Sequence, residues 1–119
     1  LESNENILLE NISSKKISVD IDLFAMALKN LIDNGIKYSS DSKVLIKEQE
    51  NTFLIISNGL ELPKPLEEYF KPFHNDTKNI NHGMGLGLYI VHSILKMHQM
   101  HLEYKYINGQ NTFTIFLKK

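Results

Sequence analysis

A change of hydrophobic period along the chain limits the folds that are open to it. Apolar residues first recur every three or four positions, as on one buried face of a helix: Ile21, Phe24, Ala25, Leu28, Leu31, Ile32 and Ile36. A second helical pattern follows residue 87, and residues 102–117 alternate between apolar and polar as strands do. Because helices and strands mix without regular alternation, we expect an α+β sandwich with helices covering one face of a sheet.

Turn and capping residues set the expected boundaries of these elements. Asp20 is a plausible cap for the first helix, which should fade near Tyr38. The other expected elements are short strands at residues 7–9 and 17–19, strands at 44–47 and 52–56, a loop at 57–65, a helical piece at 66–69 and a C-terminal hairpin about Asn108-Gly109.

Composition indicates one folded domain, residues 1–119, and excludes several functions. Thirteen Lys and Arg residues against fourteen Asp and Glu residues give a net charge of −1, so there is no field to attract nucleic acid. Every basic residue is Lys, and the chain has no Cys for thiolate chemistry. No apolar run approaches the roughly 20 residues that span a bilayer, so we expect no direct membrane contact from this domain.

A glycine-rich segment, Gly83-Met84-Gly85-Leu86-Gly87, is the strongest local signal. Glycines at alternate positions let backbone N–H groups converge on an anion, and the helix expected just after them adds its positive end. Phosphate is the natural ligand, although a helix boundary without any ligand is the alternative. The order of residues matches neither the dinucleotide-binding fingerprint nor the P-loop, which needs Lys after its last glycine.

Two asparagines mark the first helix. Asn30 and Asn34 are four residues apart and therefore share a face. Their amide oxygens suit Mg²⁺ and their amide groups suit phosphate, while Lys37 offers a cation and Tyr38 an aromatic face. The alternative is that these are ordinary polar residues of a surface helix.

The order of the motifs resembles a known family. Residues 30–39 (Asn-Leu-Ile-Asp-Asn-Gly-Ile-Lys-Tyr-Ser), 70–73 (Phe-Lys-Pro-Phe) and 83–88 are similar to the N box, F box and second glycine box of the catalytic, ATP-binding domain of sensor histidine kinases. The resemblance runs from about Asp20 to the C-terminus. It implies a Bergerat-type two-layer sandwich, with a mixed, mostly antiparallel sheet and ATP held beside the first long helix.

The resemblance also implies roles for individual residues. Asn34 would coordinate Mg²⁺, Asn30 would assist at the metal or the phosphates, Lys37 would contact phosphate, and Tyr38 would pack on the adenine side. The second glycine box, Gly83, Met84, Gly85, Leu86 and Gly87, would bring backbone amides to the triphosphate. Residues 74–82 would form the lid over the nucleotide.

The reaction implied is transfer of the γ-phosphoryl group of Mg-ATP to a histidine elsewhere. Related ATP hydrolases have Glu where Asn30 stands, and an amide cannot act as a general base at neutral pH. None of the five histidines lies in the acidic, proline-containing context of a phosphoacceptor. The expected partners are therefore a histidine-bearing dimerisation domain of the same parent kinase and a downstream response regulator. We expect a cytoplasmic domain whose parent is anchored in the bacterial inner membrane.

The first glycine box departs from the family pattern Asp-x-Gly-x-Gly. Ser57 stands at the Asp position and Asn58 is chemically closer to Asp, while Gly59 is the one glycine retained. We expect weaker adenine recognition, because neither residue carries the charge that strengthens the bond. Asn75 lies where many relatives have Arg, and Lys78 is the expected substitute. Two alternatives remain open, a degenerate nucleotide-binding regulatory module and an ATP hydrolase of the same fold.

Overall fold

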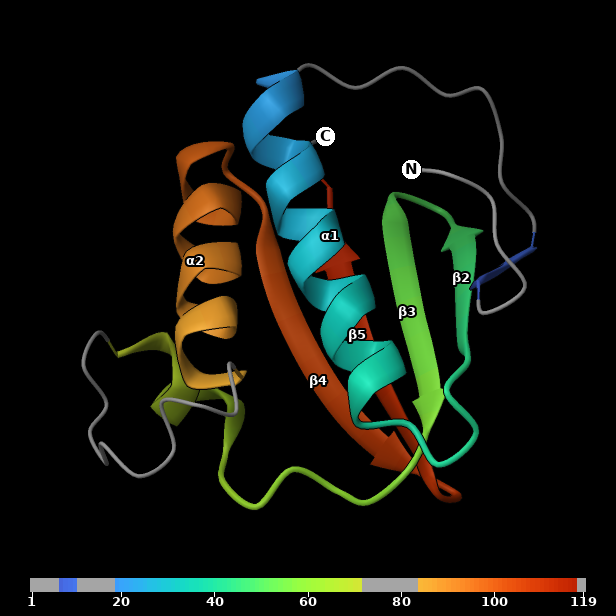
Figure 1. Ribbon diagram of the computed structural model, residues 1–119. Coiled ribbons are helices and arrows are strands. Elements are labelled where there is room, and N and C mark those ends of the chain that lie inside the picture. Colours follow the sequence, from blue (N-terminus) through green and yellow to red (C-terminus); the bar gives the residue numbers. More distant parts are fainter. Residues whose placement is uncertain (1–6, 11–18, 72–83, 118–119) are drawn as a thin grey trace.

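A five-stranded sheet forms one layer of the molecule and two helices form the other (Figure 1). The structure, a computed structural model, describes residues 7–10, 19–71 and 84–117. Its elements are β1 (Ile7–Glu10), α1 (Ile21–Lys37), β2 (Val44–Gln49), β3 (Thr52–Asn58), the 3-10 helix η1 (Leu66–Phe70), α2 (Met84–Met97), β4 (His101–Ile107) and β5 (Gln110–Phe116). The sequence-based expectation of an α+β sandwich is confirmed.

The sheet has the order β1-β2-β3-β5-β4. Only the β1–β2 pair is parallel, and the three other pairs are antiparallel. Figure 1 shows α1 and α2 side by side on the same face of this sheet. The expected strand at 17–19 is not supported, since Val19 lies outside any strand and residues 17–18 are not among those described.

Helix α1 begins and ends as its sequence predicts, but its buried face is rotated. The Asp20 side chain caps it by accepting a hydrogen bond from Leu23 N at 3.1 Å. Ile21 is 78% exposed and Ala25 is also exposed, so these two members of the expected stripe face away from the core. The buried face is formed by Phe24, Ala27, Leu31, Ile32 and Gly35. The polar face of α1 is therefore also rotated from the expected one, and this rotation sets the direction in which Asn30 and Asn34 point.

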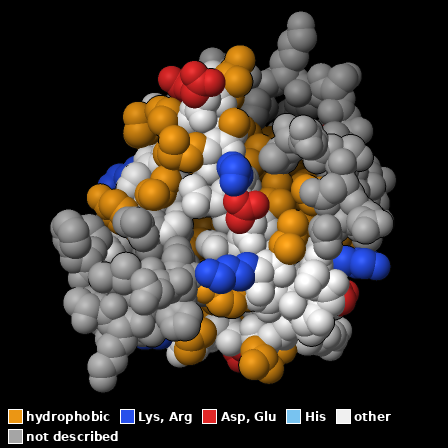
Figure 2. All heavy atoms as spheres, in the orientation of Figure 1, with side chains coloured by type: hydrophobic (Ala, Val, Ile, Leu, Met, Phe, Trp, Pro, Cys, Tyr) orange, Lys and Arg blue, Asp and Glu red, His pale blue; other side chains and the backbone are white. Residues whose placement is uncertain are grey.

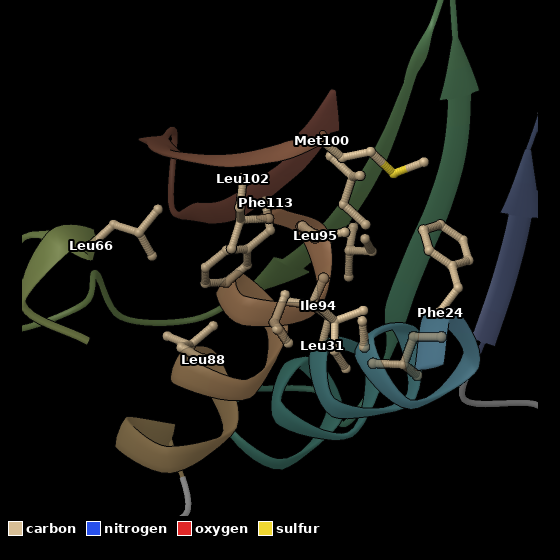
Figure 3. Packing of buried hydrophobic residues seen from close by; sticks show 14 of the residues in the cluster. Phe24, Leu31, Leu66, Leu88, Ile94, Leu95, Met100, Leu102 and Phe113 are labelled. Atoms are coloured by element: carbon tan, nitrogen blue, oxygen red, sulfur yellow. The ribbon is translucent and has the colours of Figure 1, made fainter. Parts of the chain in front are cut away.

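The core lies between the helices and the sheet. Its most completely buried side chains are Leu31, Ile32, Val44, Ile55, Leu88, Val91, Leu95 and Ile115, drawn from both helices and three strands. Figure 3 shows Leu31 of α1 close to Ile94 and Leu95 of α2, with Phe113 of β5 nearby. Burial of each such side chain contributes about 1.5–3 kcal/mol. This packing fixes the position of α2 against α1 and therefore the space between their polar faces.

The expected C-terminal hairpin is confirmed. Asn108 and Gly109 have φ values of 52° and 79°, the left-handed pair that a two-residue hairpin turn needs. Strand β5 then pairs with β3 along its whole length, which places Asn111 opposite Ser57. Strand β3 is longer than expected and continues through Asn58, so Ser57 and Asn58 lie in a strand rather than in a loop.

Candidate functional site

The two asparagines of α1 lie against the start of α2. A methyl group added to buried Gly87 would lie 3.2 Å from Asn34 Nδ2 and 3.5 Å from Asn30 Oδ1. Glycine at this position therefore lets α2 approach the polar side of α1. The structure brings together three residues that the sequence assigned to two separate motifs.

The Asn34 amide lacks a partner. Its Nδ2 atom is buried without a hydrogen bond, and it is the one buried side-chain nitrogen or oxygen in that condition among the described residues. Leaving such a group unpaired costs about 1–3 kcal/mol. Asn30, by contrast, donates from Nδ2 to Met26 O at 3.0 Å. Asn34 therefore retains hydrogen-bonding capacity that a ligand with polar oxygens would use.

From Met84 onward, the glycine-rich segment belongs to a helix rather than to a loop before one. Helix α2 begins at Met84, so Gly85 and Gly87 lie within its first four residues. The expectation that the helix follows Gly87 is therefore wrong in its boundary. The consequence for anion binding is the same, because the first N–H groups of a helix have no acceptor within it and carry partial positive charge. The first turn contains no acidic residue to oppose an anion.

Lys37 and Tyr38 stand at the C-terminal end of α1, about one turn beyond Asn34. Lys37 is the last residue of the helix and Tyr38 is its C-cap, and the Lys37 Nζ atom lies 5.4 Å from the centroid of the Tyr38 ring. Tyr38 is 36% exposed and borders a shallow hollow of about 480 Å³ together with Gly59 and Leu60. Tyr38 and Gly59, the retained glycine of the first glycine box, thus border the same hollow.

The structure separates Ser57 from Asn58. Ser57 is 8% exposed, whereas Asn58 points to the opposite side of the strand. The Asn58 amide donates to Asp41 and accepts from Gln110, each at 3.1 Å. Hydrogen bonds from the Ser39 hydroxyl and from the Asn58 amide lower the pKa of Asp41. Of the two residues that could replace the family's Asp, Ser57 is the one on the side of the helices.

Gly59 is required by a close approach of two backbones. A methyl group on its Cα would lie 2.8 Å from the carbonyl oxygen of Tyr38, and backbone atoms cannot yield as a flexible side chain can. Its N–H donates to Gly109 O at 3.0 Å. The segment after β3 is thereby held between the end of α1 and the C-terminal hairpin.

Comparison with known proteins decides the family. Residues 19–119 match the family model described as Histidine kinase-, DNA gyrase B-, and HSP90-like ATPase. The chain belongs to this family. The match begins one residue before Asp20, where the resemblance in the sequence was expected to start, so that expectation is confirmed.

Individual relatives of this ATPase-family domain are sensor kinases. The chain is 36% identical to the sensor histidine kinase ArsS of Helicobacter pylori over 115 residues, covering 96% of this chain and 27% of ArsS. It is 32% identical to the sensor histidine kinase HprS of Escherichia coli, covering 87% of this chain and 24% of HprS. It thus spans about a quarter of the length of these curated relatives. The solved cytoplasmic segment of histidine kinase QseC shares the fold, with a TM-score of 0.67 at 22% identity over 96% of this chain and 59% of that one.

Part of the F box is described. Phe70 of η1 stacks on His92 of α2, with ring centroids 3.9 Å apart and planes 9° apart. Burial, and secondarily the charge of Lys96, lower the pKa of His92. The stack joins the element that precedes residues 72–83 to the helix that follows them.

Several predicted residues cannot be placed. Lys78, Gly83 and the rest of the F box lie outside the described residues, as does the predicted lid at 74–82. Met84 and Leu86 are placed as part of α2 without a description of their side chains. In the described ranges, no helix combines the length and apolar character needed to cross a lipid bilayer, and no cluster of three or more His, Asp or Glu side chains is placed to hold a metal.

Sequence reasoning missed Asn111. Together with Ser57 it is one of the two buried polar residues of the described chain, and the two are cross-strand neighbours. A signal was present, because Asn111 occupies the position of an apolar residue on the buried face of β5, followed at alternate positions by Phe113, Ile115 and Leu117. A polar residue in such a row needs a partner.

Among the described residues, the side of the helices carries no extended charged patch. Figure 2 shows only a few acidic and basic side chains, of mixed sign, on the part of that face that is not drawn in grey. An ion pair on α1 joins Lys29 and Asp33 at 2.7 Å, and both side chains are largely exposed.

Proposed function

We propose that this domain binds Mg-ATP beside the α1–α2 contact and supplies the γ-phosphoryl group for transfer to a histidine of a separate dimerisation domain. The observation that carries the proposal is the unpaired Asn34 amide, buried against Gly87 at the start of α2. The unpaired atom is a donor, Nδ2, and it lies beside the first turn of α2, so this position is suited to a ligand rich in anionic oxygens.

The residues present fit the magnesium ion that accompanies ATP. Asn34 would bind it through Oδ1, an oxygen ligand of the kind Mg²⁺ prefers, with the phosphates and water completing the shell. Asn30 and Lys37 would assist, Asn30 through its Oδ1 near Gly87 and Lys37 as a cation for the phosphates. When bound, the ion neutralises charge on the phosphate groups. The domain's own contribution is to hold those groups in place.

The second glycine box would bind the phosphates and the end of α1 the base. Backbone amides of Gly85 and Gly87 would bind the phosphates, and the resemblance in the sequence assigns Gly83, Met84, Leu86 and Lys78 to the same task. On the adenine side we propose Tyr38 and Gly59, which border one hollow, and Ser57, which is buried on the side of the helices. Asn58 borders the same hollow, but it is the weaker candidate because its amide is already paired with Asp41 and Gln110.

Transfer is favoured over hydrolysis by the chemistry of Asn30. Its Nδ2 donates to the backbone of its own helix, and its amide cannot remove a proton from water. The reaction therefore waits for a nucleophile supplied from elsewhere. We propose that this nucleophile is a histidine of a dimerisation domain in the same parent kinase, and that a response regulator receives the phosphoryl group next.

The proposed location is the cytoplasm, in a parent anchored in the bacterial inner membrane. Support comes from the similar solved structure, which is the cytoplasmic segment of a histidine kinase.

Titration calorimetry with a non-hydrolysable ATP analogue, with and without Mg²⁺, tests the proposal. The parent domain should bind in a magnesium-dependent manner and Asn34→Ala should not. Asp33→Ala is the matched control, since Asp33 is exposed on the same helix and pairs only with Lys29 among the contacts given for it. Equal magnesium-dependent binding by Asn34→Ala would contradict the assignment. No binding by the parent at millimolar analogue would favour a regulatory module, and release of free phosphate by the isolated domain would favour a hydrolase.

A further inference from the structure

The segment that follows β3, residues 59–62, is held by the C-terminal hairpin. The Tyr106 hydroxyl donates to Gly59 O at 2.8 Å, and Gly59 N donates to Gly109 O at 3.0 Å. Two further bonds from the hairpin reach Leu60 and Leu62. A stretch without regular structure therefore has four of its backbone groups bound by one neighbouring hairpin.

Tyr104 and Asn111 form the inner part of this arrangement, which we name the Tyr104–Asn111 latch. The Tyr104 hydroxyl donates to Asn111 Oδ1 and accepts from Leu62 N at 3.0 Å. Asn111 Nδ2 donates to Leu60 O at 2.9 Å. Burial raises the pKa of the Tyr104 hydroxyl above its ordinary value, which further favours the protonated form that donates to Asn111. Each bond in the latch depends on the others being made.

The latch is anchored in the core rather than on the surface. The Tyr104 ring packs against Phe113, with centroids 5.1 Å apart. Asn111 is 7% exposed, so its amide requires the two partners that it has. Removing the Tyr104 hydroxyl would leave the buried Asn111 Oδ1 without this bond.

The position of the latch connects it with the base end of the proposed site. Asn111 is directly opposite Ser57, which stands at the place of the family's Asp. The first glycine box lacks its second glycine, since Glu61 occupies that place. The family pattern would place a second glycine in residues 59–62. In this chain, hydrogen bonds from side chains of the hairpin fix that segment instead.

We propose that the Tyr104–Asn111 latch positions residues 59–62 and Ser57 for recognition of the nucleotide base. Tyr104 and Asn111 are positioning residues in this proposal, which rests on the proposed binding of ATP. The latch sets affinity for the base of the nucleotide and has no part in gripping its phosphates.

Two ligands separate these effects. Titration calorimetry would compare a non-hydrolysable ATP analogue with inorganic tripolyphosphate, both with Mg²⁺, for the parent, Tyr104→Phe and Asn111→Ala. Loss of the latch should weaken binding of the analogue about tenfold, on the order of one buried hydrogen bond. It should weaken binding of tripolyphosphate less than about twofold. The double variant should be little weaker than either single one, because both remove the same unit.

Ile115→Val is the control for a general loss of stability. Ile115 is fully buried in the same hairpin and touches no latch atom among the bonds given for the latch. The Ile115→Val variant should have a lower melting temperature and unchanged affinities for the ATP analogue and for tripolyphosphate. Hydrogen exchange of the Leu62 amide should speed up in Tyr104→Phe, which keeps the ring and removes the acceptor.

Weaker binding of the analogue in the latch variants, with unchanged binding of tripolyphosphate, would support the proposal. An unchanged affinity, or an equal fall for both ligands in step with the melting temperature, would show that the latch is only structural. If the parent binds tripolyphosphate but not the analogue, the latch does not serve base recognition. If it binds neither, the proposed function fails and this inference fails with it.

Discussion

The two ends of the proposed nucleotide site are built in opposite ways. At the α1–α2 contact, an amide is buried without a partner and a glycine keeps the space beside it open. At the β3–β5 end, buried Asn111 has both ends of its amide paired and the backbone next to it is held by side chains. The first end is left unsatisfied in the absence of ligand, and the second is organised in advance. Phosphate binding should therefore depend on single residues, and base binding on a network.

The largest effect should come from Asn34→Ala. We expect magnesium-dependent binding of the ATP analogue to fall by about 100-fold or more, as for removal of a charge-assisted contact. The free domain should nevertheless be as stable or more stable by about 1 kcal/mol, because a buried unpaired amide is removed. Calorimetry and urea unfolding measure the two quantities. A strongly destabilised variant would mean that the amide is satisfied in the free domain.

Gly87→Ala should have the next largest effect. The added methyl group would lie 3.2 Å from Asn34 Nδ2 and displace that amide. We expect binding of the analogue to weaken about tenfold, the scale of one disturbed polar contact. Gly35→Ala is the matched control, because its methyl group would lie equally close to Val44 Cγ2 on the core side. It should lower the melting temperature without changing affinity, and equal affinities for the two variants would remove Gly87 from the site.

Ser57→Ala and Asn58→Ala compare neighbouring residues at the base end. Ser57 is buried on the side of the helices, and Asn58 is exposed and paired with Asp41 and Gln110. We expect Ser57→Ala to weaken binding of the ATP analogue roughly three- to tenfold, as for loss of one neutral hydrogen bond. Asn58→Ala should change this affinity less than about twofold. Competition binding against the parent domain resolves such differences. The reverse order would restore Asn58 as the adenine partner.

The smallest effect concerns pH and the stacking of Phe70 of η1 on His92 of α2. Burial lowers the pKa of His92 in the folded domain, so the unfolded chain binds the proton more readily. The stability associated with neutral His92 is therefore complete above the unfolded pKa and declines as pH falls through that value towards the folded one. Urea unfolding at pH 7.5 and at successively lower pH should show this decline. His92→Phe, which keeps an aromatic ring stacked on Phe70, should reduce this decline in stability with falling pH. An identical pH profile in the variant would exclude His92 as the source of the decline.

Local pattern was enough for much of the fold. Helix α1, its Asp20 cap and the Asn108-Gly109 turn are each encoded in neighbouring residues, and all three are confirmed, although the buried face of α1 is rotated from the expected one. The start of α2 was misplaced, since a run of glycines reads as a loop when it is considered alone. In the structure, packing of Leu88, Val91 and Leu95 against the core holds that helix in place, and it begins at Met84.

The sequence by itself determined the family, the order of the motifs and most of the candidate residues of the site. Tertiary structure alone decided which of those residues meet. Gly87 is more than fifty positions from Asn34, and their contact exists because two helices pack on one sheet face. The choice between Ser57 and Asn58 depends on which side of β3 faces the helices, and Asn111 matters because strand register sets it opposite Ser57. Local propensity cannot specify such contacts, because they are fixed by the packing of distant segments around a shared core.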